Sequence, residues 1–199
     1  MAVVISGHAA AFGDLGHQLV CDIAWRYLDD DAQKEVIKLL RETRYHTFAE
    51  SCTWPDHIKS DHAYDFAKPH HYINVDRDAT VVTETDRCTK DGCVVDAIRY
   101  YQSILSGEKP VNTHYLDDKS KALMFLGHFV GDVHQPLHVS YADDLGGNKV
   151  SLEYQGQYTN PHKVWDTLLV VDDQYPSWKE YGSALYEDIQ DTDMSQWDI

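Results

Sequence analysis

The chain has 199 residues, of which 43% are hydrophobic, so one substantial core in a single globular domain is expected. With 17 Lys and Arg against 33 Asp and Glu, its formal net charge is −16, which argues against a basic nucleic-acid-binding face or an anchor for anionic membranes. To bind a polyanionic ligand, the protein therefore needs positive charge that its side chains do not supply, and bound metal ions are the obvious source.

The first eleven residues, MAVVISGHAAA, are apolar and end in small side chains. They resemble the end of a secretory signal peptide with its cleavage site, so we interpret residues 1–11 as a signal-peptide remnant and 12–199 as the functional domain. A disordered tag is the alternative. No apolar stretch approaches the length of a membrane span, so no stable membrane association is expected. Four cysteines without a Cys-x-x-Cys pair favour two disulfides, and with them a secreted protein or one in a secretory-pathway compartment.

Helical periodicity dominates the rest of the chain. Apolar residues at three- and four-residue steps predict helices over 15–28, 31–42, 94–105, 119–133, 162–169 and 178–189. Gly107 is expected to close the third helix, and Pro136 to stop the fourth. The Leu-Gly-Gly-Asn turn at 145–148, followed by alternating apolar residues, predicts a short hairpin or extended loop. The expected fold class is all-α with a short β-hairpin excursion.

Several of the 12 histidines lie close to aspartates at regular spacings. His128 and Asp132 are four residues apart, which places both side chains on one face of the predicted fourth helix. His162 and Asp166 repeat this spacing later in the chain. A single pair of this kind is more often a surface hydrogen bond or a weak ion pair than a set of metal ligands.

Further histidines and aspartates favour the metal-binding interpretation. Pro136 ends the fourth helix and lets His138 return towards the same region, and His17, Asp56 and His71 lie upstream. An active site that needs several ligands predicts such a surplus, whereas solvated helix faces do not. A mixed His and Asp set without Cys is more typical of catalytic than of structural zinc sites.

Six short motifs carry a specific resemblance. In chain order they are Phe12-Gly-x-x-Gly-His17, Thr53-Trp-Pro-Asp56, His71-Tyr-Ile-Asn74, His128-Phe-Val-Gly-Asp132-x-His-Gln-Pro-Leu-His138, Gly146-Gly-Asn148 and His162-x-Val-Trp-Asp166. Together they resemble the three-zinc single-strand-specific nucleases, a family that includes the fungal nucleases S-one and P-one and the plant bifunctional nucleases. The match runs from Phe12 to about Asp166, and its His128–His138 string is the most specific part.

The resemblance implies a fold, an activity and a cofactor. The fold is the all-α helical fold shared by zinc-dependent phospholipase C and nuclease P-one. The activity is that of a zinc-dependent endonuclease, which hydrolyses single-stranded DNA and RNA to 5′-phosphate products and also acts on 3′-nucleotides. The implied cofactor is three Zn²⁺, and we expect a monomer.

The resemblance also assigns ligands by position. One zinc ion is expected on Asp56, His71, His128 and Asp132, and a second on His138, His162 and Asp166. The third is expected on His17, Asp132 and the free amino group and carbonyl of Phe12, where the family usually has Trp. Because those last ligands are backbone atoms, removal of residues 1–11 is expected to be required for a complete third site.

Five residues are expected to act in catalysis or substrate binding. Asp56 and Asp132 hold zinc, with Asp132 bridging two ions, and Lys59 matches a basic family position that can meet charge on phosphorus. An ordinary surface lysine is the alternative for Lys59. Tyr72 matches an aromatic residue that stacks on a nucleobase, although it can equally be a core residue, and Asn74 matches a position that binds the base edge, often as Asp.

The resemblance pairs Cys21 with Cys52 and Cys88 with Cys93. Family chains usually continue well beyond the last Asp ligand, so a C-terminally truncated domain is expected. Two alternatives remain at this point. A zinc-dependent phospholipase C shares the fold and most ligands, but its last ligand is typically Glu where this chain has Asp166. The other alternative is an inactive, truncated family member whose site never assembles.

Overall fold

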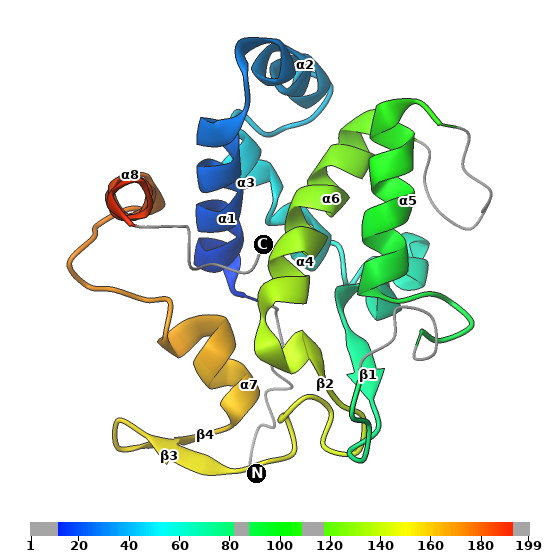
Figure 1. Ribbon diagram of the computed structural model, residues 1–199, viewed down its shortest axis with the longest axis vertical. Coiled ribbons are helices and arrows are strands. Elements are labelled where there is room, and N and C mark those ends of the chain that lie inside the picture. Colours follow the sequence, from blue (N-terminus) through cyan, green and yellow to red (C-terminus); the bar gives the residue numbers. More distant parts are fainter. Residues whose placement is uncertain (1–11, 82–87, 109–117, 193–199) are drawn as a thin grey trace.

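The computed structural model describes residues 12–81, 88–108 and 118–192, and it contains all six helical segments predicted from the periodicity (Figure 1). Residues 1–11, interpreted as a signal-peptide remnant, lie outside the described residues, as do residues 193–199. The five long helices are α1 (Asp14–Tyr27), α2 (Asp30–Leu40), α5 (Val94–Ser106), α6 (Lys119–His134) and α8 (Trp178–Asp191).

Local chemistry fixes the ends of these helices. The Asp29 side chain accepts hydrogen bonds from the backbone of Asp31 and Ala32 and so caps the start of α2. Gly107 ends α5 with a φ of 82°, a left-handed conformation that glycine adopts easily. Helix α6 ends two residues before Pro136, as predicted.

Several helical segments were not predicted. They are α3 (Phe48–Ser51), α4 (Trp54–His57) and the 3₁₀ segments η1 (His62–His71) and η2 (Pro136–His138). Three or four residues cannot display a helical period, and the ten-residue η1 is a 3₁₀ segment interrupted at Tyr64. The helix expected after His162 consists of a single α turn, α7 (Pro161–Lys163), which runs directly into a π-helical turn, η3 (Val164–Leu168).

Helix α6 is the central element, lying between α1 and α5 (Figure 1). Towards α5 it contributes Phe125 and Phe129, whose rings are stacked 5.3 Å apart, and Tyr101 of α5 stacks on Phe125 at 4.9 Å. On another face Leu123 packs in a second apolar cluster that contains Cys21. Two apolar faces thus fix the direction in which the polar stripe of α6 points.

Two pairs of short strands accompany the helices. Strands β3 (Leu152–Tyr154) and β4 (Gln157–Thr159) form an antiparallel hairpin, one of the two forms predicted for the segment after the turn at 145–148. Strands β1 (Ile73–Val75) and β2 (Val139–Tyr141) pair in parallel, which was not predicted, and they bring together the segments that follow His71 and His138. The fold is therefore mainly α-helical with small strand pairs.

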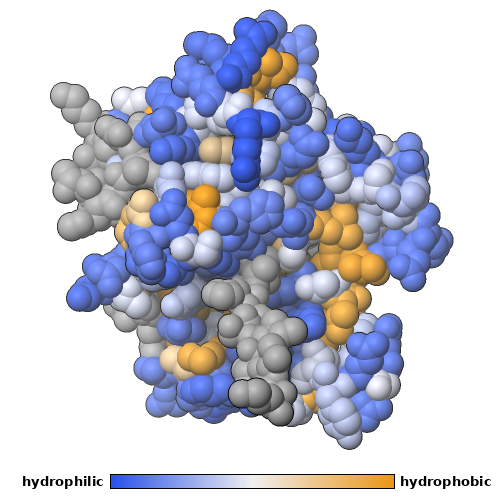
Figure 2. Space-filling view, turned by 180° about the vertical axis from the view of Figure 1, so that it is seen from behind, coloured by the Kyte–Doolittle hydropathy of each residue, from blue (hydrophilic) through white to orange (hydrophobic). Residues whose placement is uncertain are grey.

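The surface agrees with the composition. The face opposite to the view of Figure 1 is largely hydrophilic and carries only smaller hydrophobic patches (Figure 2). Within the described part of the chain, the helices are too short or too polar to cross a membrane.

Candidate metal centre

The eight side chains expected as metal ligands lie close together in one cluster. Seven of them are buried, and the side chain of Asp56 is only 5% exposed. They come from elements far apart in the sequence: His17 of α1, Asp56 of α4, His71 of η1, His128 and Asp132 of α6, His138 of η2, His162 of α7 and Asp166 of η3. Phe12 is the ninth expected ligand residue, and its ring packs edge to face with that of His17, with 6.4 Å between the ring centres. Burying so many ionisable groups is costly unless their charges are compensated.

Asp56, His71, His128 and Asp132 form what we call the central group. His128 Nε2 lies 3.4 Å from Asp56 Oδ1 and 3.2 Å from Asp132 Oδ2. His71 Nδ1 lies 3.1 Å from His128 Nε2 and 2.8 Å from Asp132 Oδ2. A tetrahedral zinc site with bonds of about 2.0–2.2 Å separates its ligand atoms by about 3.3–3.6 Å. The central group therefore has the size and the donor atoms of a zinc site.

His17, His128 and Asp132 form a second set, the α1 group. Asp132 turns Oδ1 towards this group, 3.6 Å from His17 Nε2, while its Oδ2 faces the central group. Within the described residues, neither ring nitrogen of His17 nor Oδ1 of Asp132 has a hydrogen-bond partner. Buried polar atoms are rarely left in this state, so these atoms fit a bound cation.

His138, His162 and Asp166 form the third set, the η3 group. His162 Nε2 lies 3.2 Å from Asp166 Oδ2, and His138 Nε2 lies 3.9 Å from Asp166 Oδ1. The two imidazole rings are stacked with 5.0 Å between their centres. Three side-chain ligands beside an open cleft are typical of catalytic zinc sites, which keep a position for water or substrate.

Backbone carbonyls orient three of the histidines. Nδ1 lies 2.7 Å from the Cys52 carbonyl in His128, 2.6 Å from the His71 carbonyl in His138 and 2.8 Å from the Gly146 carbonyl in His162. Because a carbonyl can only accept, each Nδ1 carries a proton, which leaves Nε2 as the ring nitrogen that can bind a metal ion. Metal-binding histidines are commonly held in this way.

Gln135 was not singled out from the sequence, yet it supports the η3 group. It is fully buried, its side-chain NH₂ donates to Asp166 Oδ1, and its carbonyl accepts from the backbone of Leu137. The amide thus ties the end of α6 to η3 and fixes the orientation of the Asp166 carboxylate. The signal in the sequence was its place inside the His128–His138 motif, directly before Pro136.

Gly146 explains the Gly-Gly-Asn motif. Its φ is 60°, and a Cβ atom there would lie 2.3 Å from the Leu137 carbonyl oxygen. Only glycine fits this position without displacing backbone. The close approach lets the Gly146 carbonyl reach His162, so the turn predicted at 145–148 serves the η3 group.

The electrostatics of the centre favour the ionised forms of Asp132 and Asp56. Burial raises the pKa of Asp132, but His128, His138 and His71 outweigh it and hold the pKa well below its usual value. Burial likewise raises the pKa of Asp56, and His128 and Lys59 reverse the effect. A buried cluster with two ionised carboxylates requires compensating positive charge.

The pKa values of the remaining ligands indicate their charge in the absence of a metal ion. Burial lowers the pKa of His17 and of His71 to about 3, so both are neutral and able to act as ligands. Burial also lowers the pKa of His128, but Asp132 and Asp56 outweigh it and raise that pKa to about 9. Burial raises the pKa of Asp166 to about 7. A proton on His128 thus supplies the charge that the carboxylates demand, as a bound cation would.

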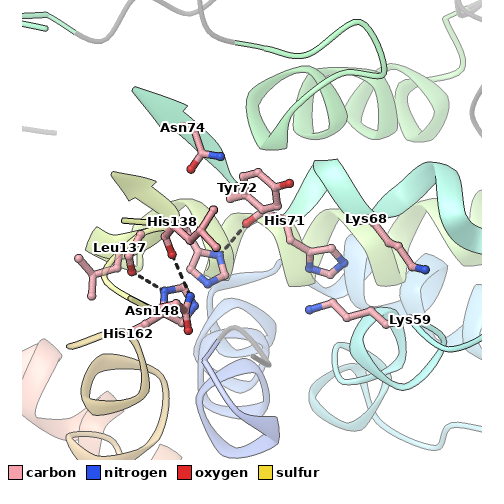
Figure 3. A pocket seen from close by; sticks show the side chains of 11 residues that line it. Lys59, Lys68, His71, Tyr72, Asn74, Leu137, His138, Asn148 and His162 are labelled. Atoms are coloured by element: carbon pink, nitrogen blue, oxygen red, sulfur yellow. Dashed lines mark hydrogen bonds between the residues drawn. The ribbon is translucent and has the colours of Figure 1, made fainter. Parts of the chain in front are cut away.

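An open cleft of about 380 Å³ borders the central and η3 groups. Figure 3 shows Lys59, Tyr72 and Asn74 around it, together with His71 and His138. Tyr72 is 36% exposed, so it is not a core residue, and its ring is available at the cleft. Lys59 lines the cleft and reaches back to Asp56 Oδ1 at 2.5 Å, which links the cleft to the central group.

Both disulfides pair as expected. Cys21 of α1 is bonded to Cys52, which directly follows α3, and Cys88 is bonded to Cys93 at the start of α5. The described part of the chain contains no free cysteine.

Comparison with known proteins agrees with the motifs. A model of the family described as S1/P1 Nuclease matches residues 12–199. Endonuclease 3 of Arabidopsis thaliana is 38% identical over 165 residues, which cover 81% of this chain and 55% of that protein. Endonuclease 2 of the same plant is 30% identical over 191 residues, covering 94% of this chain and 65% of that protein.

A fungal relative shows the same likeness. Nuclease S1 of Aspergillus oryzae is 34% identical over 159 residues, which cover 78% of this chain and 53% of that protein. The chain thus spans between 53% and 65% of the length of these three relatives. Their names favour a nuclease over a phospholipase C.

Proposed function

Because the chain belongs to the S1/P1 nuclease family, we propose that it is a zinc-dependent endonuclease that hydrolyses single-stranded DNA and RNA to 5′-phosphate products. The observation that carries this proposal is a cluster of three His and Asp groups, two of which border a cleft with an available aromatic ring. The same site can accept 3′-nucleotides, which present one base and one phosphate.

The proposed ligand sets follow the three groups. The central group holds one zinc ion, the η3 group holds a second, and His17 and Asp132 hold a third together with the amino group and carbonyl of a free Phe12 N-terminus. When bound, zinc supplies a Lewis acid and positive charge for a phosphodiester in a chain whose own net charge is −16. Asp132 joins two groups because its two oxygens face different neighbours.

The cleft residues bind and orient the substrate. Tyr72 stacks on a base, which requires that the base is unpaired and accounts for a preference for single strands. The Asn74 amide meets the base edge. Lys59 brings an ammonium group next to Asp56, where it can contact the charge that develops on the phosphoryl oxygens.

The surroundings of the protein follow from the same features. Two disulfides suit an oxidising compartment, so we place the protein outside the cell or in the secretory pathway, acting as a monomer without stable membrane association.

One experiment tests the proposed function. Zinc content is measured after dialysis, and the release of nucleotides from single-stranded DNA is compared with that from a duplex of the same sequence, with and without a chelator. We expect bound zinc, faster cleavage of the single strand and loss of cleavage with the chelator. A protein without bound zinc, or equal rates on both substrates, would contradict the proposal.

A matched pair of variants isolates the role of Tyr72. Base stacking contributes about 1–3 kcal/mol, so Tyr72→Ala should raise the KM for single-stranded DNA by about 5-fold to 150-fold. Tyr72→Phe keeps the ring and should leave the KM near that of the unmodified chain. An unchanged KM in Tyr72→Ala would remove the stacking role.

A further inference from the structure

The Cys21–Cys52 disulfide lies next to the metal centre, because the Cys52 carbonyl contacts His128. Cys21 follows His17 by one turn of α1, and Cys52 precedes Asp56 by four residues, so the bond joins two segments that each carry an expected ligand. Both cysteines are buried, at 1% and 0% exposure.

Gly127 brings α6 against this bond. A Cβ atom at Gly127 would lie 2.6 Å from Cys52 Sγ and 2.7 Å from Cys21 Sγ, closer than side-chain carbons pack. The helix backbone therefore rests on the two sulfur atoms with no space between them. The next residue is His128, which donates from Nδ1 to the Cys52 carbonyl at 2.7 Å. The backbone of α6 at Gly127 and the imidazole ring of His128 thus both contact the disulfide-bonded Cys52.

We propose that the Cys21–Cys52 disulfide is a positioning element for His128, acting through the Cys52 carbonyl and the contact with Gly127. This inference rests on the proposed zinc-binding function. His128 belongs to both the central group and the α1 group, so the direction of its Nε2 affects two groups at once. The bond fixes Cys52 relative to α1, and the carbonyl of Cys52 in turn fixes the ring of His128.

The first variant removes the bond. Cys21→Ala with Cys52→Ala should weaken zinc binding by about 10-fold to 100-fold in competition with a chelator, the typical effect of losing a group that orients a ligand. The matched control, Cys88→Ala with Cys93→Ala, removes the other disulfide and should keep the zinc affinity of the unmodified chain. In the zinc-free protein, ¹⁵N NMR should show faster hydrogen exchange at His128 Nδ1 in the first variant only.

The second variant keeps the bond and disturbs the contact. Gly127→Ala should lower zinc affinity and the thermal midpoint, because its Cβ meets both sulfur atoms. In the protein that lacks the Cys21 and Cys52 sulfur atoms, the same substitution should cost less stability, because two of its three close neighbours are gone and only Phe48 Cζ, at 2.9 Å, remains. Gly107→Ala, with a φ of +82° and open space around it, controls for a loss of stability away from the centre.

The inference would be overturned if the disulfide variant and Gly127→Ala both kept the zinc affinity and the His128 Nδ1 exchange rate of the unmodified chain. If the disulfide variant does not fold, the test rests on Gly127→Ala alone. A zinc affinity lower than that of Gly107→Ala supports the inference, and an equal zinc affinity overturns it. An unmodified chain that binds no zinc would instead refute the proposed function, and the inference would fall with it.

Discussion

Asp132→Asn removes the one carboxylate that faces two metal-binding groups. The substitution keeps the shape of the side chain but replaces one oxygen with an NH₂ group, which cannot bind a cation. Four-ligand zinc sites bind with about 10–16 kcal/mol, which is about 2.5–4 kcal/mol for each ligand. At 1.4 kcal/mol for each factor of ten, the loss of one ligand weakens binding on the order of 100-fold. Both the central group and the α1 group should suffer this loss.

Thermal unfolding at a fixed zinc concentration measures the effect. At a zinc concentration of about 100 Kd, one site stabilises the folded chain by about 2.7 kcal/mol, and a 100-fold weaker site by about 0.4 kcal/mol. For a chain of this size the difference corresponds to about 5–9 °C in Tm for each affected site. Hydrolysis of single-stranded DNA, followed in parallel, should be abolished.

Asp22→Asn is the matched control. Asp22 is also a buried carboxylate, 8% exposed, but it pairs with Arg26 at 2.8 Å and belongs to none of the three groups. The Asp22→Asn protein should keep the zinc-dependent rise in Tm of the unmodified chain. An Asp132→Asn protein with the full rise and normal turnover would refute the bridging role of Asp132.

Three further predictions address other parts of the centre. A chain that begins at Phe12 should bind one more zinc ion than a chain that retains residues 1–11, because an amide nitrogen has no available lone pair; equal zinc contents would withdraw the N-terminal ligand. Gln135→Glu places a carboxylate beside Asp166 and should weaken zinc binding by about 10-fold to 100-fold in chelator competition, and unchanged affinity would contradict its positioning role. In the zinc-free protein, the His128 pKa is raised from 6.5 to about 9, so its proton stabilises the fold fully below pH 6.5, and this contribution is lost as the pH rises towards 9. The urea midpoint should therefore fall between about pH 7 and about pH 9 in a chelator-containing buffer, and a constant midpoint would argue against a protonated His128.

The sequence alone predicted the long helices, because each carries enough residues to show its period. It also placed His128 and Asp132 on one face of a helix, since a spacing of four residues has the same meaning in any α-helix. The ligand set and its three zinc ions came from the family motifs. They remain predictions that the structure makes geometrically reasonable, since it brings these side chains within ligand distance.

Only the tertiary structure revealed how the ligands are held. The parallel pairing of β1 with β2, the buried amide of Gln135 and the carbonyls of Cys52 and Gly146 depend on contacts between residues far apart in the chain. A backbone carbonyl has no sequence signature, because every residue has one. Which carbonyl contacts which imidazole is decided by how the elements pack, and this packing brings His and Asp residues from distant parts of the chain into three groups, two of which share His128 and Asp132.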